Sequence, residues 1–520
     1  MNAVATHEIE ERRGQEQACL DSLKTARERN KWGQFATPPE LALSIARYAH
    51  SLLEEKPVRF LDPAIGTGSF YSALLQAFPP ERIEVATGVE LDPIFAEAAA
   101  ALWGNAGLRV VRGDFTEQPL PSQRFNVILT NPPYVRHHHL AASQKDRLRQ
   151  QLAQSLNFDV SGLAGLYCYF LLLCHDWMED RGLAVWLIPS EFMDVNYGAV
   201  LRRYLTERVT LLHIHRFSPT DVQFTDALVS SAVVVFRKLP PAPDHAACFS
   251  FAGPIERPQK EVMVPLETLR RSRKWTQYPG GASPNDSGEL TLGDIFTIKR
   301  GLATGNNLFF VLNEANAQRL DLPPRFLKPI LPGPRHLTGD VIEALPSGAP
   351  DVSPRLFLLD CSEPEERIRT AWPRLYAYLQ HGRAQNIHTT YLTSRRTPWY
   401  SQEQRPPAPF LCTYMGRANN GKHPIRFLWN RSQATAHNVY LMLYPQGRLR
   451  EALNAQPELQ ARVFEALKRI NPAELVSEGR VYGGGLHKVE PKELAQIPAR
   501  TVLESMDTRL GIERQEMLFT

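Results

Sequence analysis

The 520-residue sequence predicts an α/β protein: a mostly parallel sheet with helices on both faces, followed by a second domain of mixed α and β structure. Three observations lead to this prediction. Helical and strand-like segments alternate from about residue 38 to 238, which is typical of parallel strands joined by helices. Clusters of proline, glycine and serine at 238–247 and 278–289 are linker-like. Beyond them the segments are shorter and richer in proline, arginine and aromatic residues.

Each expected element follows from its apolar pattern. Helices are predicted where apolar residues recur at helical spacing, and strands where a short apolar run ends in a turn. In chain order the sequence predicts a charged helical lead-in over 1–30, a helix at 39–53, a strand at 58–64, a helix at 68–78, a strand at 84–91, a helix at 93–107, strands at 108–115 and 125–133, a helix at 166–182, and strands at 183–192, 211–217 and 230–238. We therefore expect an α/β domain over 31–240, a linker over 241–290 and a second domain over 291–520.

The composition indicates a soluble globular protein of the cytoplasm. Hydrophobic residues make up 43% and charged residues 22%, which is ordinary for that class. No apolar run approaches the roughly 20 residues of a membrane span, and the polar N-terminus is not a secretory signal. The six cysteines show no CxxC pair and no zinc spacing, so we expect free thiols and no metal site.

The first strand ends in "FLDPAIGTGSF" (60–70), where Asp62 precedes Gly66 and Gly68. In an open α/β sheet a ligand lies beyond the carboxyl end of this strand, and glycines let it approach the backbone. A tight strand-to-helix turn is the alternative for the glycines alone. Tyr71 stands where a dinucleotide-binding motif has its third glycine, so a dehydrogenase is not favoured.

The next two strands also end in carboxylates. Glu90 follows the glycines by about twenty residues, where an acid can accept both hydroxyls of a ribose. Asp114 ends the third strand and is suited to accept a hydrogen bond from an adenine amine. Together these positions predict a nucleoside-containing cofactor.

The fourth strand stops abruptly at Asn131-Pro132-Pro133-Tyr134. The prolines remove two backbone donors and fix the chain direction, so neither strand nor helix continues. We interpret this corner as a holder for an amino group, with the Asn131 side-chain carbonyl and the Pro132 backbone carbonyl as acceptors. Tyr134 offers a flat face for a base, and a core tyrosine is the alternative.

A basic and aromatic segment lies in the second domain. Between Arg367 and Arg431 there are eleven Lys or Arg residues and one acid, Glu403, with ten aromatic residues among them. Such a segment suits contact with phosphates and bases, and a solvated face is an equally good alternative. The residues expected to bind DNA are Arg395, Arg396, Arg417 and Lys422.

Five motifs occur in the order "GQFATPPELA" (33–42), "LDPAIGTGSF" (61–70), "GVELDP" (88–93), "GDF" (113–115) and "TNPPYV" (130–135). In this order the chain resembles the gamma-class N6-adenine-specific DNA methyltransferases of type II restriction–modification systems. The resemblance covers the first 240 residues and reaches the second domain through residues 299–312 and 483–499, segments like those that bracket the target-recognition domain of that family. Ile65 departs from the family, where Cys is frequent, and this should affect packing only.

The resemblance implies a Rossmann-like methyltransferase domain, a target-recognition domain, and S-adenosyl-L-methionine as the cofactor. It also assigns roles to residues by position. Leu166 and Tyr167 are expected near the cofactor's adenine, and a position in the core is nearly as good an alternative. The implied cofactor-binding residues are Thr37, Asp62, Ala64, Gly66, Gly68, Glu90, Leu91, Asp114, Phe115 and Asn131, and the implied catalytic residues are Asn131, Pro132, Pro133, Tyr134 and Phe224, with the last two enclosing a flipped base.

The expected function is sequence-specific methylation of adenine N6 in double-stranded DNA by a restriction–modification enzyme. N4-cytosine DNA methylation is the main alternative, and methylation of RNA or of a protein glutamine amide is a weaker one. "EPK" at 490–492 lacks an upstream Pro-Asp partner, so we expect cleavage to belong to a separate cognate endonuclease. His137, His138 and His139 lack a second ligand cluster and are expected near the DNA backbone. We expect no membrane partner and a monomer or weak dimer.

Overall fold

The computed structural model describes residues 3–218, 223, 230–280, 290–417, 425–472, 474–475, 479–482 and 486–506. Its contacts divide the chain into two compact units. Unit one comprises residues 1–282 and 482–484, and unit two comprises residues 283–481 and 485–520. The division after residue 282 lies within the segment 241–290 for which the sequence predicts a linker.

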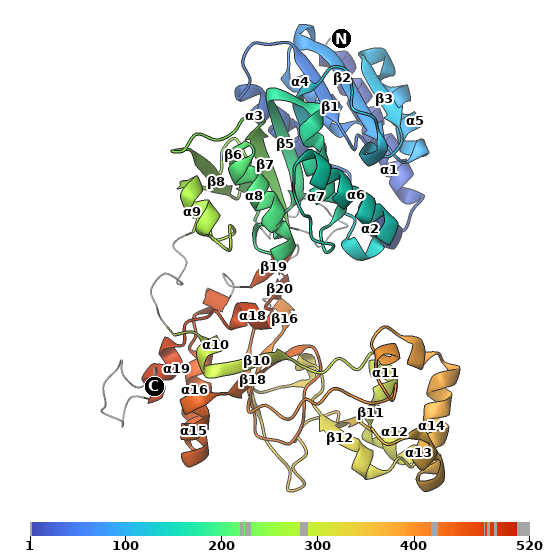
Figure 1. Ribbon diagram of the computed structural model, residues 1–520, viewed down its shortest axis with the longest axis vertical. Helices are drawn as coiled ribbons and strands as arrows, with labels where there is room; N and C mark the ends of the chain where they lie inside the picture. Colours follow the sequence, from blue (N-terminus) through green and yellow to red (C-terminus); the bar gives the residue numbers. More distant parts are fainter. Residues whose placement is uncertain are drawn as a thin grey trace. The chain divides into compact units, whose positions relative to one another are not determined.

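Unit one is built on a sheet of nine described strands (Figure 1). They are β1 (Val58–Asp62), β2 (Ile83–Glu90), β3 (Leu108–Arg112), β4 (Phe125–Thr130), β5 (Met178–Pro189), β6 (Thr210–Arg216), β7 (Ser231–Arg237), β8 (Ala246–Phe251) and β9 (Lys260–Pro265). Their order across the sheet is β3-β2-β1-β4-β5-β7-β6-β8-β9. Pairing is parallel from β3 to β5 and between β6 and β8, and antiparallel elsewhere. The order reverses between β1 and β4, the point at which open α/β sheets bind ligands.

The helices of unit one cover both faces of this sheet (Figure 1). Alternate strand residues point to opposite faces. Leu61 and Ile128 pack in a core with helical residues of 142–207, whereas Phe60 and Val127 pack in a core with helical residues of 39–103. The predicted fold class is therefore confirmed. The helices are α1 (Ala3–Ser22), α2 (Ala26–Trp32), α3 (Pro39–Ser51), α4 (Ser69–Ala77), α5 (Pro93–Trp103), α6 (Ala142–Ser155), α7 (Leu166–Leu173), α8 (Ala199–Glu207) and α9 (Leu266–Arg271).

Two predicted elements differ from the structure. Much of the predicted linker, 241–290, forms β8, β9 and α9, and Phe249 and Val264 are buried in the core of unit one. The prolines before β8 therefore mark a turn between strands. The helix predicted over 166–182 ends at Leu173, and β5 already begins at Met178. A continuous apolar run cannot distinguish a buried helix from the buried strand that follows it.

Unit two contains smaller described sheets with the strand orders β10-β18-β15-β17-β13, β11-β14-β12 and β16-β20-β19 (Figure 1). The strands are β10 (Phe296–Arg300), β11 (Val311–Asn313), β12 (Leu327–Ile330), β13 (Val341–Ile342), β14 (Leu356–Leu359), β15 (Phe410–Thr413), β16 (Met415–Arg417), β17 (Phe427–Asn430), β18 (Tyr440–Pro445), β19 (Arg480–Tyr482) and β20 (Leu486–Lys488). The helices are α10 (Leu292–Ile295), α11 (Asn307–Phe310), α12 (Glu314–Arg319), α13 (Glu365–Ala371), α14 (Pro373–Ala384), α15 (Gly447–Ala455), α16 (Leu459–Lys468), α18 (Pro491–Leu494) and α19 (Arg500–Met506). Among the described residues of both units, no helix is long and apolar enough to cross a membrane.

Candidate active site

Three polar side chains lie along the carboxyl edge of the parallel part of the sheet. Asp62 ends β1, Glu90 ends β2, and Asn131 follows β4 directly. Because β1 lies between β2 and β4, these strand ends are neighbours. The sheet therefore brings together the side chains that the sequence assigns to one site.

Asp62 holds the base of the loop between β1 and α4. Its Oδ1 accepts hydrogen bonds from Thr130 Oγ1 at 2.6 Å and from the Ala64 backbone N–H at 3.0 Å. Burial raises the pKa of this carboxyl to about 7, although both hydrogen bonds favour the ionised form. Asp62 is only 1% exposed, so its hydrogen bonds stabilise the loop from the buried side.

The two glycines of this loop face different surroundings. A Cβ at Gly68 would lie 2.5 Å from Trp103 Nε1, so this position is closed by α5. At Gly66 no atom of the described residues lies within 4 Å of the Cβ position. The loop thus has one packed side and one open side, and the open side is the place where a ligand can approach the backbone.

Glu90 bridges two backbone segments through its carboxylate. Oε2 accepts from Gly66 N–H and Oε1 accepts from Asp92 N–H, both at 2.9 Å. Burial raises its pKa, and the two N–H donors oppose that shift. Each oxygen keeps a further lone pair for an incoming hydroxyl. Leu91, the residue expected against the adenine ring, is 59% exposed beside it.

After β3 come the partly buried Asp114 and the buried Phe115. Asp114 Oδ1 accepts from the backbone N–H and the hydroxyl of Thr116, both at 2.8 Å. The neighbouring Phe115 is 3% exposed and packs on Phe170 and Trp177, with ring centroids 5.2 and 4.9 Å away. The Phe115 ring is therefore a core side chain, and only its backbone remains suited to the predicted adenine contact. Tyr167, 2% exposed, is also in this core.

The Asn131 side chain is fixed in one orientation. Nδ2 donates to the Phe35 carbonyl at 2.9 Å and to Thr37 Oγ1 at 3.2 Å. A flipped amide would place Oδ1 against the Phe35 carbonyl, which would repel it, so Oδ1 must point the other way. This oxygen is buried and has no hydrogen-bond partner among the residues that the structure describes.

An unpaired buried acceptor is rare in folded proteins and calls for an explanation. The expected contact of Thr37 with the cofactor is joined here by a second role, because its hydroxyl anchors the Asn131 amide. The sequence did not indicate Phe35 or Thr130 as partners of the site. Both lie inside the motifs, next to residues that were predicted.

The rest of the corner is locked to the segment that precedes α3. Tyr134 N–H donates to the Gly33 carbonyl at 3.1 Å. Gly33 has φ +64°, and a Cβ there would lie 2.3 Å from Tyr134 N, so only glycine fits. Tyr134 itself is 6% exposed, and its hydroxyl donates to the Leu187 carbonyl at 3.0 Å. Its ring lies 5.6 Å from the Phe35 ring, so a base reaches it only if the groups that cover it move.

The predicted second wall of the base pocket, Phe224, lies outside the described residues, as does Lys422. The three consecutive histidines form a short 3₁₀ turn, His137–His139. Within the described part of the chain, no group of three or more His, Cys, Asp or Glu residues could hold a metal ion.

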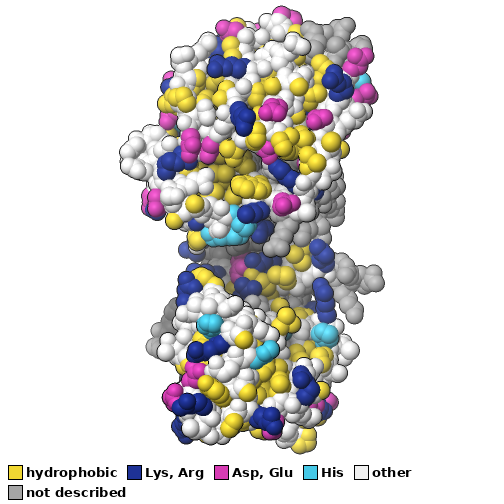
Figure 2. Space-filling model, turned by 90° about the vertical axis from the view of Figure 1, so that its right-hand side faces the viewer, with side chains coloured by type: hydrophobic (Ala, Val, Ile, Leu, Met, Phe, Trp, Pro, Cys, Tyr) yellow, Lys and Arg dark blue, Asp and Glu magenta, His cyan; other side chains and the backbone are white. Residues whose placement is uncertain are grey.

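The basic segment of unit two is largely neutralised by acids. Three of the six acids directly precede the segment, one lies inside it and two are distant in the sequence; the pairs are Arg367–Glu363, Arg369–Glu366, Arg383–Glu365, Arg405–Glu403, Arg426–Asp340 and Arg431–Glu343. On the face seen in Figure 2, the Lys and Arg side chains of unit two are accordingly scattered. The alternative of a solvated, ion-paired face therefore accounts for much of this segment.

Arg395 and Arg396 have different surroundings. The exposed Arg395 guanidinium lies 3.7 Å from the centroid of the Tyr391 ring, and Tyr391 is 72% exposed. Arg396 donates to the Thr304 carbonyl at 2.8 Å and to the Ala303 carbonyl at 2.7 Å, and burial lowers its pKa. The Arg396 side chain braces a loop through these hydrogen bonds, and its expected contact with DNA stays a prediction. Among the described residues, Arg395 and the exposed Arg417 make no ion pair.

Comparison with known proteins is consistent with this geometry. Residues 98–223 match the family model described as Eco57I restriction-modification methylase, and residues 285–518 match that of the type II methyltransferase M.Eco57I, C-terminal domain. The chain is 28% identical over 473 residues to the type II methyltransferase M.XamI of Xanthomonas campestris pv. amaranthicola, covering 89% of this chain and 84% of that protein. It is 23% identical over 485 residues to the type II methyltransferase M.AccI of Acinetobacter calcoaceticus, covering 90% and 85%.

Among solved structures, the type IIL restriction-modification enzyme MmeI in complex with DNA shares the fold. The match has a TM-score of 0.52 at 12% identity and covers 95% of this chain and 74% of that chain. The two family models together extend across both units.

The cofactor of these methyltransferases is S-adenosyl-L-methionine, and the strand edge fits it. Glu90 has carboxylate oxygens that can accept further hydrogen bonds, Gly66 leaves open space beside the backbone, and Asn131 has a buried oxygen without a partner among the described residues. Two family models, two relatives of similar length and the fold lead to one assignment. The chain belongs to the type II restriction–modification DNA methyltransferases.

Proposed function

We propose that the chain methylates the exocyclic N6 of an adenine within a specific sequence of double-stranded DNA. The observation that carries this proposal is the unpaired Asn131 Oδ1 at the end of β4. An exocyclic amine is a hydrogen-bond donor, and it would satisfy this acceptor on binding. The Pro132 backbone carbonyl, held by the rigid corner, would accept the second amine hydrogen.

These two acceptors explain how an amine with little intrinsic reactivity is methylated. The lone pair of an exocyclic amine is delocalised into the ring. Hydrogen bonds to Asn131 and Pro132 hold the hydrogens where the lone pair can point at the methyl group. S-adenosyl-L-methionine supplies an electrophilic methyl carbon, so that the new N–C bond forms as the S–C bond breaks and its electron pair returns to sulfur. The acceptors also stabilise the positive charge that develops on nitrogen, and the extra proton leaves afterwards to solvent.

The carboxylates are suited to binding the cofactor and are poorly placed to act as bases. Asp62 Oδ1 is engaged by Thr130 and Ala64, and Glu90 is engaged by two backbone N–H groups. We assign Glu90 to the ribose hydroxyls, Gly66 and Ala64 to the methionine end, and Leu91 and Asp114 to the cofactor's adenine; the expected contact of Gly68 is not included, because Trp103 closes that side of the loop. This division leaves catalysis to orientation and charge stabilisation at the corner.

The target base must leave the duplex to reach Asn131, because its amine is paired inside the helix. We assign Tyr134 and Phe224 to the walls of its pocket. A stacked aromatic contributes about 1–3 kcal/mol per base. The low exposure of Tyr134 indicates that its ring becomes available only when the pocket opens.

Unit two is assigned to target recognition. The solved relative MmeI was captured with DNA, and residues 285–518 match a methyltransferase C-terminal domain. Arg395 lies on the Tyr391 ring and donates to the Tyr391 carbonyl at 2.7 Å; neither it nor the exposed Arg417 of β16 makes an ion pair with a residue that the structure describes. We assign cleavage to a separate cognate endonuclease.

Cytosine N4 is the second candidate target, because its exocyclic amine would satisfy Asn131 Oδ1 equally well. The deciding experiment incubates the protein with S-adenosyl-L-methionine and unmethylated plasmid DNA, and then measures modified nucleosides by mass spectrometry. The expected product is N6-methyladenine at one sequence motif. N4-methylcytosine would overturn the adenine assignment and keep the mechanism at Asn131, whereas the absence of any methylated nucleoside in the plasmid would overturn the substrate class.

A further inference from the structure

Helix α1 places a buried arginine against the packed side of the glycine loop. Arg13 is 2% exposed, and its Nη1 donates to Thr67 Oγ1 at 3.0 Å. Nε and Nη2 donate to the two carboxylate oxygens of Glu10 at 2.8 and 2.7 Å. The Thr67 hydroxyl donates in turn to Gln17 Oε1 at 2.8 Å. Two residues of α1 thus hold one side chain of the loop in one rotamer.

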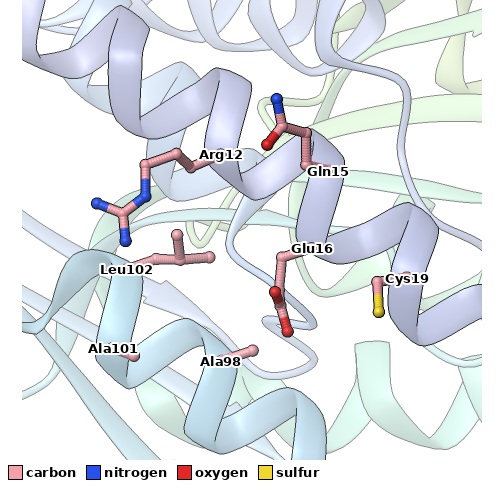
Figure 3. A pocket seen from close by; sticks show the side chains of 7 residues that line it. All are labelled: Arg12, Gln15, Glu16, Cys19, Ala98, Ala101 and Leu102. Atoms are coloured by element: carbon pink, nitrogen blue, oxygen red, sulfur yellow. The ribbon is translucent and has the colours of Figure 1, made fainter.

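Both polar and apolar side chains dock this helix. Among the side chains of α1 that the structure describes, Thr6, Arg13 and Leu20 are buried, and Ile9 packs partly buried against the core. On another side of α1, Arg12 and Glu16 face Ala98 and Ala101 of α5. A hollow of about 470 Å³ lies between the two helices (Figure 3). The hydrogen bonds of Arg13 and Gln17 therefore add polar contacts with Thr67 to the apolar contacts of α1.

The loop is pinned from the α5 side as well. Trp103 Nε1 donates to the Thr67 carbonyl at 2.9 Å, and the same indole closes the space beside Gly68. Thr67 is therefore held through both its side chain and its backbone. Gly66, one residue earlier, faces open space with its N–H on Glu90. The position of the Gly66 backbone depends on the contacts that fix Thr67.

A second contact reaches the acidic loop after β2. Lys24, which follows α1, donates from Nζ to Asp92 Oδ2 at 2.5 Å, with both side chains mostly buried. Asp92 N–H donates to Glu90 Oε1. The N-terminal segment therefore contacts both loops that are assigned to the cofactor, once through Thr67 and once through Asp92.

We propose that Arg13 and Lys24 are positioning residues for S-adenosyl-L-methionine, acting through Thr67 and Asp92 on the two loops that bind it. This inference rests on the cofactor placement given under the proposed function. It makes the charged N-terminal segment part of the cofactor site although none of its described residues needs to touch the cofactor. A shift of the Gly66 and Glu90 backbone by loss of either contact would weaken cofactor binding and leave the Asn131 corner in place.

The test compares Arg13→Met with its neighbour Arg12→Met, which removes an exposed arginine from the same helix. We expect Arg13→Met to raise the Kd and KM for S-adenosyl-L-methionine by about tenfold, because the loop loses a charged donor that fixes Thr67. The kcat at saturating cofactor and the Kd for DNA should stay near those of the unchanged protein, and Arg12→Met should match that protein throughout. Arg13→Lys should give an intermediate Kd, because an ammonium group lacks the planar guanidinium geometry that donates to both Thr67 and Glu10.

Thr67→Val gives a second route to the same result, and it replaces Arg13→Met in the test if that variant does not fold. Thr67→Val combined with Arg13→Met should raise the Kd by less than the product of the single effects, since both remove one contact. Lys24→Met should raise the same Kd independently. Equal cofactor affinity in Arg13→Met and Arg12→Met, or a parallel loss of DNA binding and of kcat, would overturn the inference. Failure of the unchanged protein to bind S-adenosyl-L-methionine would instead overturn the proposed function.

Discussion

The strand edge of unit one and the arginine-rich segment of unit two both concentrate polar groups, but they satisfy those groups differently. At the edge, Asn131 keeps a buried oxygen without a partner among the described residues, although its amide nitrogen has two acceptors. In the segment, most arginines are paired with carboxylates. A buried polar group left unpaired lowers the stability of the fold. A ligand that donates a hydrogen bond to this group removes that cost and gains affinity. Paired arginines are explained by the fold without any ligand.

The largest expected effect removes the open acceptor. Asn131→Ala should lower kcat by at least about 100-fold, the loss typical when one transition-state hydrogen bond is removed, while the Kd for S-adenosyl-L-methionine changes little. Asn126→Ala, earlier on the same strand, is the matched control, because that amide is fully used between Arg59 N–H and the Pro57 carbonyl. It should cost stability and spare kcat. Equal losses of kcat in the two variants, measured by methyl transfer to cognate DNA, would remove the distinction between open and satisfied amides.

The next effect concerns the carboxylate that links two loops. Glu90→Gln replaces one acceptor oxygen with an NH₂ group, which must then face a backbone N–H of Gly66 or Asp92. We expect the Kd for S-adenosyl-L-methionine to rise by about tenfold or more, since a charged acceptor of several hydrogen bonds is lost. Glu97→Gln on α5 removes a carboxylate that is 77% exposed and should leave the Kd unchanged. Isothermal titration calorimetry with both variants measures the difference, and equal Kd values would contradict the role of Glu90.

The strand edge was predictable from sequence because its geometry is local. Asp62, Glu90 and Asn131 each end a strand, and parallel strands place their ends on one edge whatever the intervening lengths. The anchors of Asn131 were not predictable, since its amide binds Phe35 and Thr37, which are 96 and 94 residues away in the sequence.

Partners that are distant in the sequence also explain why the pairing of some arginines in the basic segment was not predicted. Within 367–431 the sequence shows one acid, yet Arg431 pairs with Glu343, which is 88 residues distant, and Arg426 pairs with Asp340. Partners of this kind are set by packing, and no local pattern indicates them. Arg396 is a further example, because its hydrogen-bond partners, the carbonyls at 303 and 304, could not be predicted from the sequence around it.

A smaller effect tests how firmly the corner is held. Gly33→Ala adds a methyl group 2.3 Å from Tyr134 N at a residue with φ +64°, so we expect a loss of about 2 kcal/mol in the free energy of unfolding. Gly104→Ala is the control, because its φ of −56° suits any residue and no described atom lies within 4 Å of the new Cβ. Thermal unfolding should show a lower Tm for Gly33→Ala alone. Comparable Tm values would mean that the contact between residue 33 and the corner is adjustable.

The smallest expected effect distinguishes Arg395 from its neighbour Arg396 in unit two. Arg395→Ala removes a cation that lies on the exposed Tyr391 ring and makes no ion pair with a described residue. If it neutralises one phosphate, the slope of log K against log salt for DNA binding should decrease by about 0.9, with no change in Tm. Arg396→Ala removes hydrogen bonds to the Ala303 and Thr304 carbonyls, so it should lower Tm first and alter DNA affinity only through that loss. Fluorescence anisotropy at several salt concentrations measures the slope for each variant.

Arg431→Ala, which removes an ion-paired arginine, provides the reference for a cation that the fold already uses. A salt slope that decreases equally for Arg395→Ala and Arg431→Ala would show that pairing within the fold does not decide which arginines meet DNA.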